Sequence, residues 1–339
     1  SRASIENIPV LLSTSIPSLE TYNNVKNKKY NFTKLKKRYK NFSLPKTEIV
    51  NLNLDKKNKN IWLDFKTLEL VKKFLEKKEQ VLFFLNRRGY APFMICKNCG
   101  LKLACPNCSV FLTFHKHLNK AMCHHCGFKT TTEKICKKNN SNCEFQMYGP
   151  GVEKIFSELK QIFPDKIIKI LSSDFLNKKK ETLNLLRDIE KNKINILVGT
   201  QLISKGFNFP KLNCIVVVDA DFSGMGFDLR SNEKNIQLYN QLSGRAGRFS
   251  KDSHIIYQTF DPLDKTLNSL LENKQENFFE EEIYLREQKN LPPFSRLIAF
   301  IISAKNERES YLEALKIKKS LSLLNGVDIL GPVSSPIFK

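Results

Sequence analysis

The chain has 339 residues, enough for two domains and a third small one, each with its own core. Its 56 Lys and Arg residues outnumber 34 Asp and Glu residues, so the net charge of +22 favours a polyanionic partner, nucleic acid first and an anionic membrane surface second. Lysine and asparagine are used freely everywhere, so a merely solvated basic surface is the alternative. No apolar run approaches the ~20 residues that span a bilayer and no leader-like segment is found, so we expect a cytoplasmic protein with no membrane partner.

The first 60 residues predict a strand, a helix and a connector. A strand pattern covers "PVLLSTS", and a helix begins at "IPSLETY", with Pro17 in its first turn and Ser15 or Ser18 as its cap. Residues 26–60 form a Lys- and Asn-rich connector with a strand at "EIVNLNL". The chain opens on Ser1 without Met and stops at "GPVSSPIFK", so we expect a piece of a longer protein.

Strands and helices alternate through most of the remaining chain. A helix is predicted from Asp64 to Lys78 by its apolar spacing, and the buried strand "QVLFFLN" follows it. After a cysteine-rich segment, helices are predicted at 152–163, 178–191 and 232–243, between the strands "KIIKIL", "NILVGT", "CIVVVDAD" and "SHIIYQTF". This alternation predicts an α/β fold with a mostly parallel sheet covered by helices on both faces. From about residue 285, a strand, a helix and another strand predict the start of a small α/β domain.

Eight of the nine cysteines lie between Phe93 and Tyr148. These eight cysteines come in pairs that are close in sequence. In a reducing compartment such cysteine pairs favour tetrahedral zinc sites over disulfides, and eight thiolates make two sites of four ligands each. The segment has little apolar material, so metal binding of ~10–16 kcal/mol per site would have to stabilise its fold. One alternative is four disulfides. The other is that a histidine takes the place of the stretched cysteine pair as a zinc ligand, the candidates being His115, His117, His124 and His125. Three pairs have CxxC spacing and the last is stretched: Cys96/Cys99, Cys105/Cys108, Cys123/Cys126 and Cys136/Cys143.

Two stretches of the predicted sheet carry residues suited to phosphate chemistry. In "QLSGRAGR" (241–248) a helix ends in Arg245 and Arg248, whose small neighbours allow close approach and whose guanidinium groups can bind phosphate bidentately. In "ILVGTQLISKGFNFP" (196–210) a buried strand runs into Thr200, which can cap an anion-binding helix start, and Lys205 and Gly206 follow. The alternatives are a glycine-rich surface turn and an ordinary strand-to-helix turn.

Taken in order, these stretches resemble the PriA family of bacterial primosomal replication-restart helicases over essentially the whole chain. The matching stretches are "FLNRRGYAPFMICKNCG", "YGPGVEKI", "GTQLISKGFNFP", "DFSGMGFDLRSNEK", "QLSGRAGR" and "LREQKNLPPFSRL". The resemblance implies a superfamily 2 DNA helicase of 3′ to 5′ polarity that binds stalled or branched forks and initiates primosome assembly. It implies DNA, primosome proteins and single-strand-binding protein as partners, and a place at the bacterial nucleoid.

The resemblance also implies roles for individual residues. "QLSGRAGR" matches motif VI, so Arg245 and Arg248 would sense ATP with support from Gln241. "GTQLISKG" matches motif V, with Gly206 toward the nucleotide and Thr200 and Lys205 toward DNA. Arg87 and Arg88 in "NRRGY" are further DNA candidates, and "STSIPS" (13–18) resembles motif III. One zinc ion would take Cys96, Cys99, Cys136 and Cys143, and the other Cys105, Cys108, Cys123 and Cys126.

The sequence departs from the family pattern at several positions. Ser13, Ser15 and Ile16 replace the usual Gly, Ala and Thr of motif III, the Cys136/Cys143 pair is stretched, and Phe207 stands where a histidine is common. The motif III changes bear on coupling between the two helicase lobes. The stretched cysteine pair bears on the geometry of one zinc site.

The sequence contains no GxxxxGK[ST] motif and no DExH box. The resemblance places both in a first RecA-like lobe before Ser1, so we expect ATP with Mg²⁺ to need that lobe and this chain alone to be inactive as an ATPase. A stand-alone zinc-ribbon protein that binds nucleic acid without catalysis is the alternative. We expect the end of lobe 1 at residues 1–25 and a connector at 26–60. Lobe 2 is expected in two parts, 61–92 and 149–284, with a zinc-binding insertion at 93–148 between them. A truncated C-terminal domain is expected at 285–339.

Overall fold

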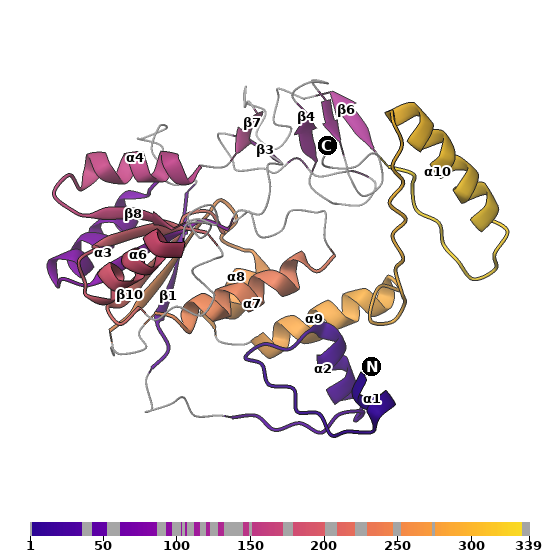
Figure 1. Cartoon of the computed structure of the whole chain (residues 1–339), viewed down its shortest axis with the longest axis horizontal. Coiled ribbons are helices and arrows are strands. Elements are labelled where there is room, and N and C mark those ends of the chain that lie inside the picture. The colour runs from indigo at the N-terminus through magenta and orange to yellow at the C-terminus, as the bar shows by residue number, and fades with distance from the viewer. Residues whose placement is uncertain are drawn as a thin grey trace.

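The computed structural model of the chain contains one parallel and one antiparallel sheet (Figure 1). The parallel sheet has helices on both faces, and the antiparallel sheet belongs to the cysteine-rich segment. The described residues are 2–35, 43–52, 62–86, 93–96, 103, 106, 112–115, 120–122, 128–131, 145–148, 151–171, 179–200, 209–220, 229–246, 252–272 and 275–333.

Six strands, all paired in parallel, form the larger sheet. Its central strands are mostly apolar and buried along their whole length, which is typical of a parallel sheet covered on both faces. The predicted parallel α/β fold is therefore confirmed. In spatial order the strands are β1 (Lys46–Asn51), β11 (His254–Thr259), β10 (Leu212–Val217), β2 (Gln80–Phe84), β9 (Ile196–Gly199) and β8 (Ile168–Leu171).

Successive side chains of the central strands enter two separate cores, as the two-residue period of a strand requires. Val81 and Phe83 of β2 pack under α3 (Phe65–Glu76) and α4 (Val152–Ile162). Leu82 and Phe84 face the opposite core. That second core is covered by α2 (Leu19–Lys26), α6 (Lys179–Glu190), α7 (Ser231–Ser243), α8 (Lys265–Leu271) and α9 (Gln275–Gln288).

Short polar side chains begin three of these helices. Of the two predicted caps for α2, Ser18 is the one that forms, and its hydroxyl accepts the Thr21 amide at 3.2 Å. Asp64 accepts the amide of Lys66 at 2.8 Å at the start of α3, and Asp264 caps α8. Such side chains satisfy amides that have no partner inside the helix.

The second sheet lies within residues 93–148 and is antiparallel, and Figure 1 shows it apart from the parallel sheet. Among described residues its core is small: Leu112 and Ala121 are buried, with Leu103 and Phe128 packed against them. The expectation that metal binding stabilises this segment stays a prediction. The strand order is β6 (Lys129–Thr131), β5 (Lys120–Met122), β4 (Thr113–His115), β3 (Phe93–Cys96) and β7 (Phe145–Tyr148).

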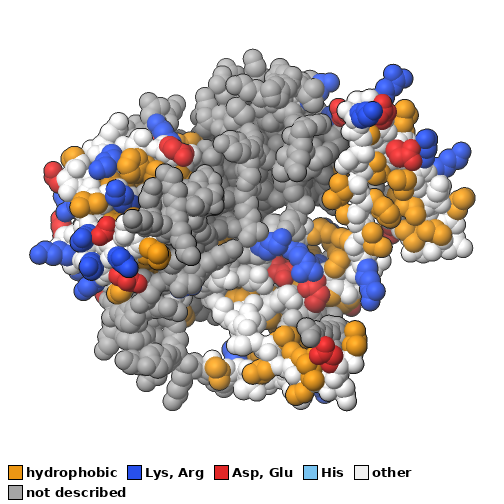
Figure 2. Space-filling model, viewed as in Figure 1, with side chains coloured by type: hydrophobic (Ala, Val, Ile, Leu, Met, Phe, Trp, Pro, Cys, Tyr) orange, Lys and Arg blue, Asp and Glu red, His pale blue; other side chains and the backbone are white. Residues whose placement is uncertain are grey.

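Three predicted strands do not form. After the short helix α1 (Arg2–Glu6), the segment 9–15 has no strand and its apolar side chains are exposed, Leu11 to 93%. In the last part of the chain only the helix α10 (Glu307–Leu321) forms, and the extended segments on either side of it pair with no strand in the described chain. A strand needs a neighbour to bond its backbone groups, and these segments have none there. Figure 2 shows the resulting exposed apolar side chains around α10.

Within the described ranges, no helix combines the length and the apolar character needed to cross a bilayer.

Candidate functional site

The carboxyl ends of three neighbouring strands meet at one edge of the parallel sheet. Phe84 at the end of β2 pairs with Gly199 of β9 and Val217 of β10. The ladder continues one residue further, because the amide of Leu85 donates to the Gly199 carbonyl at 2.9 Å. Open α/β sheets bind ligands at this edge. Thr200, predicted to contact DNA phosphate, follows β9 here and is half-buried.

Two buried polar residues at this edge were not among the predicted site residues. Asn86 follows β2 and Asp219 follows β10. The amide nitrogen of Asn86 donates to the Asn235 side chain of α7 at 3.4 Å. The Tyr239 hydroxyl of α7 donates to the Ala220 carbonyl at 3.3 Å. The bonds from Asn235 and Tyr239 fix helix α7 over this edge of the sheet. The only sequence signal for Asn86 and Asp219 is that each is a polar residue directly after an apolar run.

The predicted arginine turn begins where α7 ends. Gln241 is exposed in the last turn of the helix, and Arg245 is half-buried directly after the C-cap Gly244. A side chain at Gly244 would bring its Cβ within 3.3 Å of the Gln241 carbonyl oxygen, so only glycine leaves this turn uncrowded. The Arg245 amide donates to Leu242 at 2.9 Å, which closes the helix end.

Several predicted site residues lie outside the described residues. The structure places Thr200 at a strand end, and it places Gln241 and Arg245 at the end of α7. The predicted residues that fall outside the described ranges are Arg87, Arg88, Lys205, Gly206, Phe207, Arg248, Cys99, Cys105, Cys108, Cys123, Cys126, Cys136 and Cys143.

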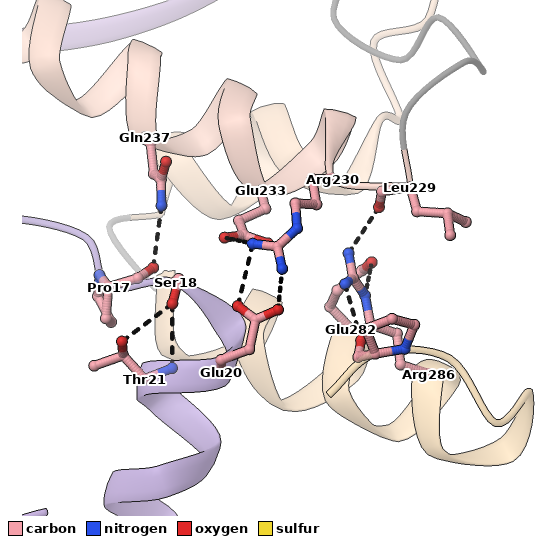
Figure 3. Close-up of polar contacts among 11 residues, drawn as sticks. Pro17, Ser18, Glu20, Thr21, Leu229, Arg230, Glu233, Gln237, Glu282 and Arg286 are labelled. Atoms are coloured by element: carbon pink, nitrogen blue, oxygen red, sulfur yellow. Dashed lines mark hydrogen bonds and ion pairs between the residues drawn. The ribbon is translucent and has the colours of Figure 1, made fainter. Parts of the chain in front are cut away.

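The motif III-like segment 13–18 is joined to α7 by polar contacts (Figure 3). Gln237 donates to the Pro17 carbonyl at 3.3 Å. The guanidinium of Arg230 holds both carboxylate oxygens of Glu20, with the Nη1 to Oε2 distance at 3.2 Å. These contacts attach the start of helix α2 to the first turns of α7.

Glu233 lies in the same network with a side chain only 4% exposed. Burial raises the pKa of its carboxyl, the Arg230 guanidinium 3.7 Å away lowers the pKa, and the Glu20 carboxylate raises it. The backbone N–H of Leu19, the first residue of α2, also lowers the pKa of this carboxyl. A carboxylate is favoured there, because a helix N-terminus carries unpaired amides and a positive dipole end.

A second arginine supports the network from the opposite side. Arg286 of α9 is 3% exposed. It donates to the Glu282 carboxylate at 3.0 Å, to the Pro292 carbonyl at 3.0 Å and to the Leu229 carbonyl at 2.7 Å. One buried guanidinium therefore ties α9 to the backbone that immediately precedes Arg230.

Described backbone residues of the antiparallel sheet flank two of the CxxC pairs in sequence. The Leu112 amide donates to the Leu103 carbonyl at 2.8 Å, and this bond spans the pair Cys105/Cys108. Met122 pairs with Lys129 across the pair Cys123/Cys126. Met122 also pairs with Thr113, so the described residues that flank these two cysteine pairs lie on neighbouring strands.

The remaining cysteines are less constrained by the described residues. Cys96 ends β3 opposite Phe145, and Cys143 comes two residues before Phe145 in sequence. Within the described part of the chain no group of three or more potential metal ligands gathers. Because the thiol groups of the proposed ligand sets lie outside what the structure describes, the two zinc sites stay a prediction.

Comparison with known proteins identifies the relatives of the chain. The helicase conserved C-terminal domain family matches residues 101–250. "Replication restart protein PriA" of Rickettsia conorii (strain ATCC VR-613 / Malish 7) is 36% identical over 338 residues, which cover 100% of this chain and 52% of that protein. The chain is PriA-like. "Replication restart protein PriA" of Bacillus subtilis (strain 168) is 31% identical over 339 residues, 99% of this chain and 42% of that protein.

The PriA-like chain spans about half the length of the curated relatives it matches. Its parallel sheet is the C-terminal, RecA-like helicase lobe that the resemblance implied. Among solved structures, S. cerevisiae Dbp5 bound to RNA and ADP BeF3 is 13% identical with a TM-score of 0.40, covering 84% of this chain and 57% of that chain. A likeness this weak carries no further argument.

Proposed function

We propose that this chain is the second motor lobe of an ATP-dependent DNA helicase of replication restart. The proposed enzyme unwinds with 3′ to 5′ polarity, binds stalled or branched forks and initiates primosome assembly. The observation that carries the proposal is the match of the whole chain to PriA relatives, at 36% identity over 338 residues. The parallel sheet, whose carboxyl edge carries Thr200 and Asn86, is the matching scaffold.

The proposed nucleotide contacts are Arg245 and Arg248, supported by Gln241 and Gly206. Arginines delivered across a cleft stabilise the charge of phosphoryl transfer, and each is worth ~10³–10⁵ in rate. The sequence has no GxxxxGK[ST] motif to cradle the phosphates and Mg²⁺ of ATP. Hydrolysis therefore needs a P-loop lobe outside these 339 residues, and the chain alone is inactive as an ATPase.

The proposed DNA contacts are Thr200, Lys205, Arg87 and Arg88. Thr200 supports this assignment by its place at the carboxyl edge of the sheet. The net charge of +22 adds sequence-independent attraction, because Lys and Arg displace the counterions condensed on DNA. Primosome proteins, single-strand-binding protein and a place at the bacterial nucleoid belong to the same proposal.

Two structural Zn²⁺ ions are proposed for the antiparallel sheet. Thiolate-bound Zn²⁺ supplies folding free energy and no catalytic step when all four ligands are protein groups. Cys214 is not a ligand, since it is buried in β10, where burial raises the pKa of its thiol. The proposed ligand sets are Cys96, Cys99, Cys136 and Cys143 for one ion, and Cys105, Cys108, Cys123 and Cys126 for the other.

Unwinding of tailed duplexes by the longer protein, in which a P-loop lobe precedes this chain, tests the proposal. We expect ATP-dependent unwinding of forks that offer a 3′ tail for loading, and none without ATP. The isolated chain should bind forked DNA with an affinity that falls steeply as salt rises. ATP hydrolysis by the isolated chain would contradict the proposal. DNA binding without unwinding by the longer protein would favour the stand-alone zinc-ribbon protein.

A further inference from the structure

We infer that Arg230, between Glu20 and Glu233, is a positioning residue that couples the motif III-like segment 13–18 to helix α7 and to the arginine turn at its end. The inference rests on the proposed function and goes beyond it, because the motif comparison assigned no role to Arg230, Glu20 or Glu233. It follows from how helix α2 is attached to the lobe.

The first step is that α2 is packed into the lobe. Leu19 is fully buried and Ile16 is 8% exposed, and both belong to the apolar cluster that contains Ile236 of α7. The ring of Tyr22 stacks on Phe279 of α9, with centroids 5.0 Å apart. Figure 1 shows α2 directly beneath α9. A movement of segment 13–22 therefore has to repack this core or carry α7 and α9 with it.

The second step is that the polar contacts to this segment come from the N-cap residue Arg230 and from one face of α7. Arg230, Glu233 and Gln237 are three and then four residues apart, the spacing that places side chains on the same side of a helix. Arg230 holds the Glu20 carboxylate with two nitrogens. Gln237 donates to Pro17, and the Leu19 N–H lowers the pKa of the Glu233 carboxyl. These three side chains therefore face residues 17–20, where α2 begins.

The third step is that these charges are placed for orientation more than for stability. Arg230 and Glu20 are 42% and 34% exposed, and ion pairs so accessible contribute little to folding. Glu233 is almost fully buried, which costs free energy unless the carboxylate is bonded. A guanidinium that binds the half-buried Glu20 carboxylate with two nitrogens and lies near the buried Glu233 carboxylate fixes the angle between α2 and α7.

The fourth step is that Arg230 stands on a rigid support that reaches the arginine turn. Buried Arg286 holds the Leu229 carbonyl at 2.7 Å, directly before Arg230. Further along α7, the ring of Tyr239 packs edge-on against Tyr257 of β11 with centroids 5.0 Å apart. A shift of Glu20 therefore moves Arg230 and with it helix α7. Arg245 directly follows the C-cap of that helix, so it moves as well.

The test uses the longer protein that carries a P-loop lobe, with the variants R230Q, E20Q and the double variant. The measured quantity is the ratio of DNA-stimulated to basal ATP hydrolysis. We expect each single variant to lower this ratio about tenfold, within the range of coupling between sites. The double variant should be no worse than either single one, because all three remove the same contact. The matched control is K265Q, which breaks the exposed Lys265–Glu281 pair and should leave the ratio unchanged.

Hydrogen exchange of the isolated chain gives a second readout that needs no ATP hydrolysis. R230Q should speed exchange of the Leu19 to Thr21 amides and leave α10 unchanged. A wild-type ratio in R230Q and E20Q, or effects that multiply in the double variant, overturns the inference while the proposed function stands. Unchanged exchange at α2 also overturns it. Lack of DNA-stimulated hydrolysis in the unmodified longer protein overturns the proposed function, and with it the coupling role.

Discussion

Tyr22 and Phe279 stack with their ring centroids 5.0 Å apart and an angle of 20° between their planes. Phe279 also meets Phe278 edge-on, with centroids at 5.6 Å. Through these rings α2 is held against α9, a helix that follows the last strand of the parallel sheet. Burial of the Tyr22 hydroxyl and the neighbouring Glu280 and Glu276 carboxylates raise the pKa of Tyr22.

Removing the Phe279 ring should destabilise the chain. Phe279 is 3% exposed, so Phe279→Ala leaves a cavity and should lower the free energy of unfolding by about 3–5 kcal/mol. Urea denaturation followed by circular dichroism measures the change. Tyr284→Ala is the matched control on the same helix, because Tyr284 is 61% exposed and its loss should cost less than about 0.5 kcal/mol. Equal effects of the two substitutions would show that the stack carries no stability.

Metal content tests the proposed zinc sites. Cys105→Ser should reduce bound zinc from about two ions per chain to about one, because three thiolates hold the ion poorly. Elemental analysis of the purified chain measures the ratio of zinc to protein. Cys214→Ser is the control, since Cys214 is buried in β10, and it should keep both ions. An unchanged zinc content in Cys105→Ser would remove Cys105 from the proposed ligands.

The arginine turn should matter for hydrolysis and not for DNA affinity. In the longer protein with a P-loop lobe, Arg245→Ala should lower the ATPase rate by about 10³-fold while DNA affinity persists. Arg245→Lys should not restore the rate, because an ammonium lacks the planar fork of a guanidinium. Steady-state hydrolysis and fluorescence anisotropy with labelled forked DNA measure the two effects. Retained hydrolysis in Arg245→Ala would show that Arg245 does not face the nucleotide.

Glu233 should make stability depend on pH. Burial raises the pKa of its carboxyl in the folded chain, although the nearby Arg230 and Arg286 guanidinium groups and the Leu19 N–H lower the pKa. Below the pKa of the unfolded chain both states hold the proton and nothing is lost. As pH rises from there to the folded pKa, the unfolded state releases its proton first, so the free energy of unfolding falls.

Glu233→Gln removes this titration and provides the comparison. The stability of the variant relative to the natural chain should therefore rise with pH over that window and then stay level. Urea midpoints of both proteins between pH 4 and pH 8 measure the difference. A difference that is constant with pH would mean that Glu233 titrates alike in the folded and unfolded chain.

Local pattern in the sequence was enough for most of the parallel sheet and its helices. The apolar runs that became β2, β9 and β10 are buried on both faces, and the spacing that predicted α3 places Val71 and Phe74 in the core. The cap at Ser18 formed as one of two candidates. These features depend on residues close together in the chain, so the sequence contains their signal.

Strand formation at the two ends could not be decided locally. Segment 9–15 has a strand pattern, yet it stays unpaired because no strand lies beside it in the described chain. Helix α9 went unpredicted, since its apolar residues are spread around the helix, and Phe279 and Ile283 are buried only by neighbours from elsewhere in the chain.

The sequence by itself determined the α/β class, the cysteine pairs and the motif order, because each of these depends on residues that are close together in the chain. Only the tertiary structure decided the strand order and the contact of Arg230 with Glu20, which come from segments far apart in the chain. Such a contact depends on how two helices pack on a shared core. No local pattern records that packing.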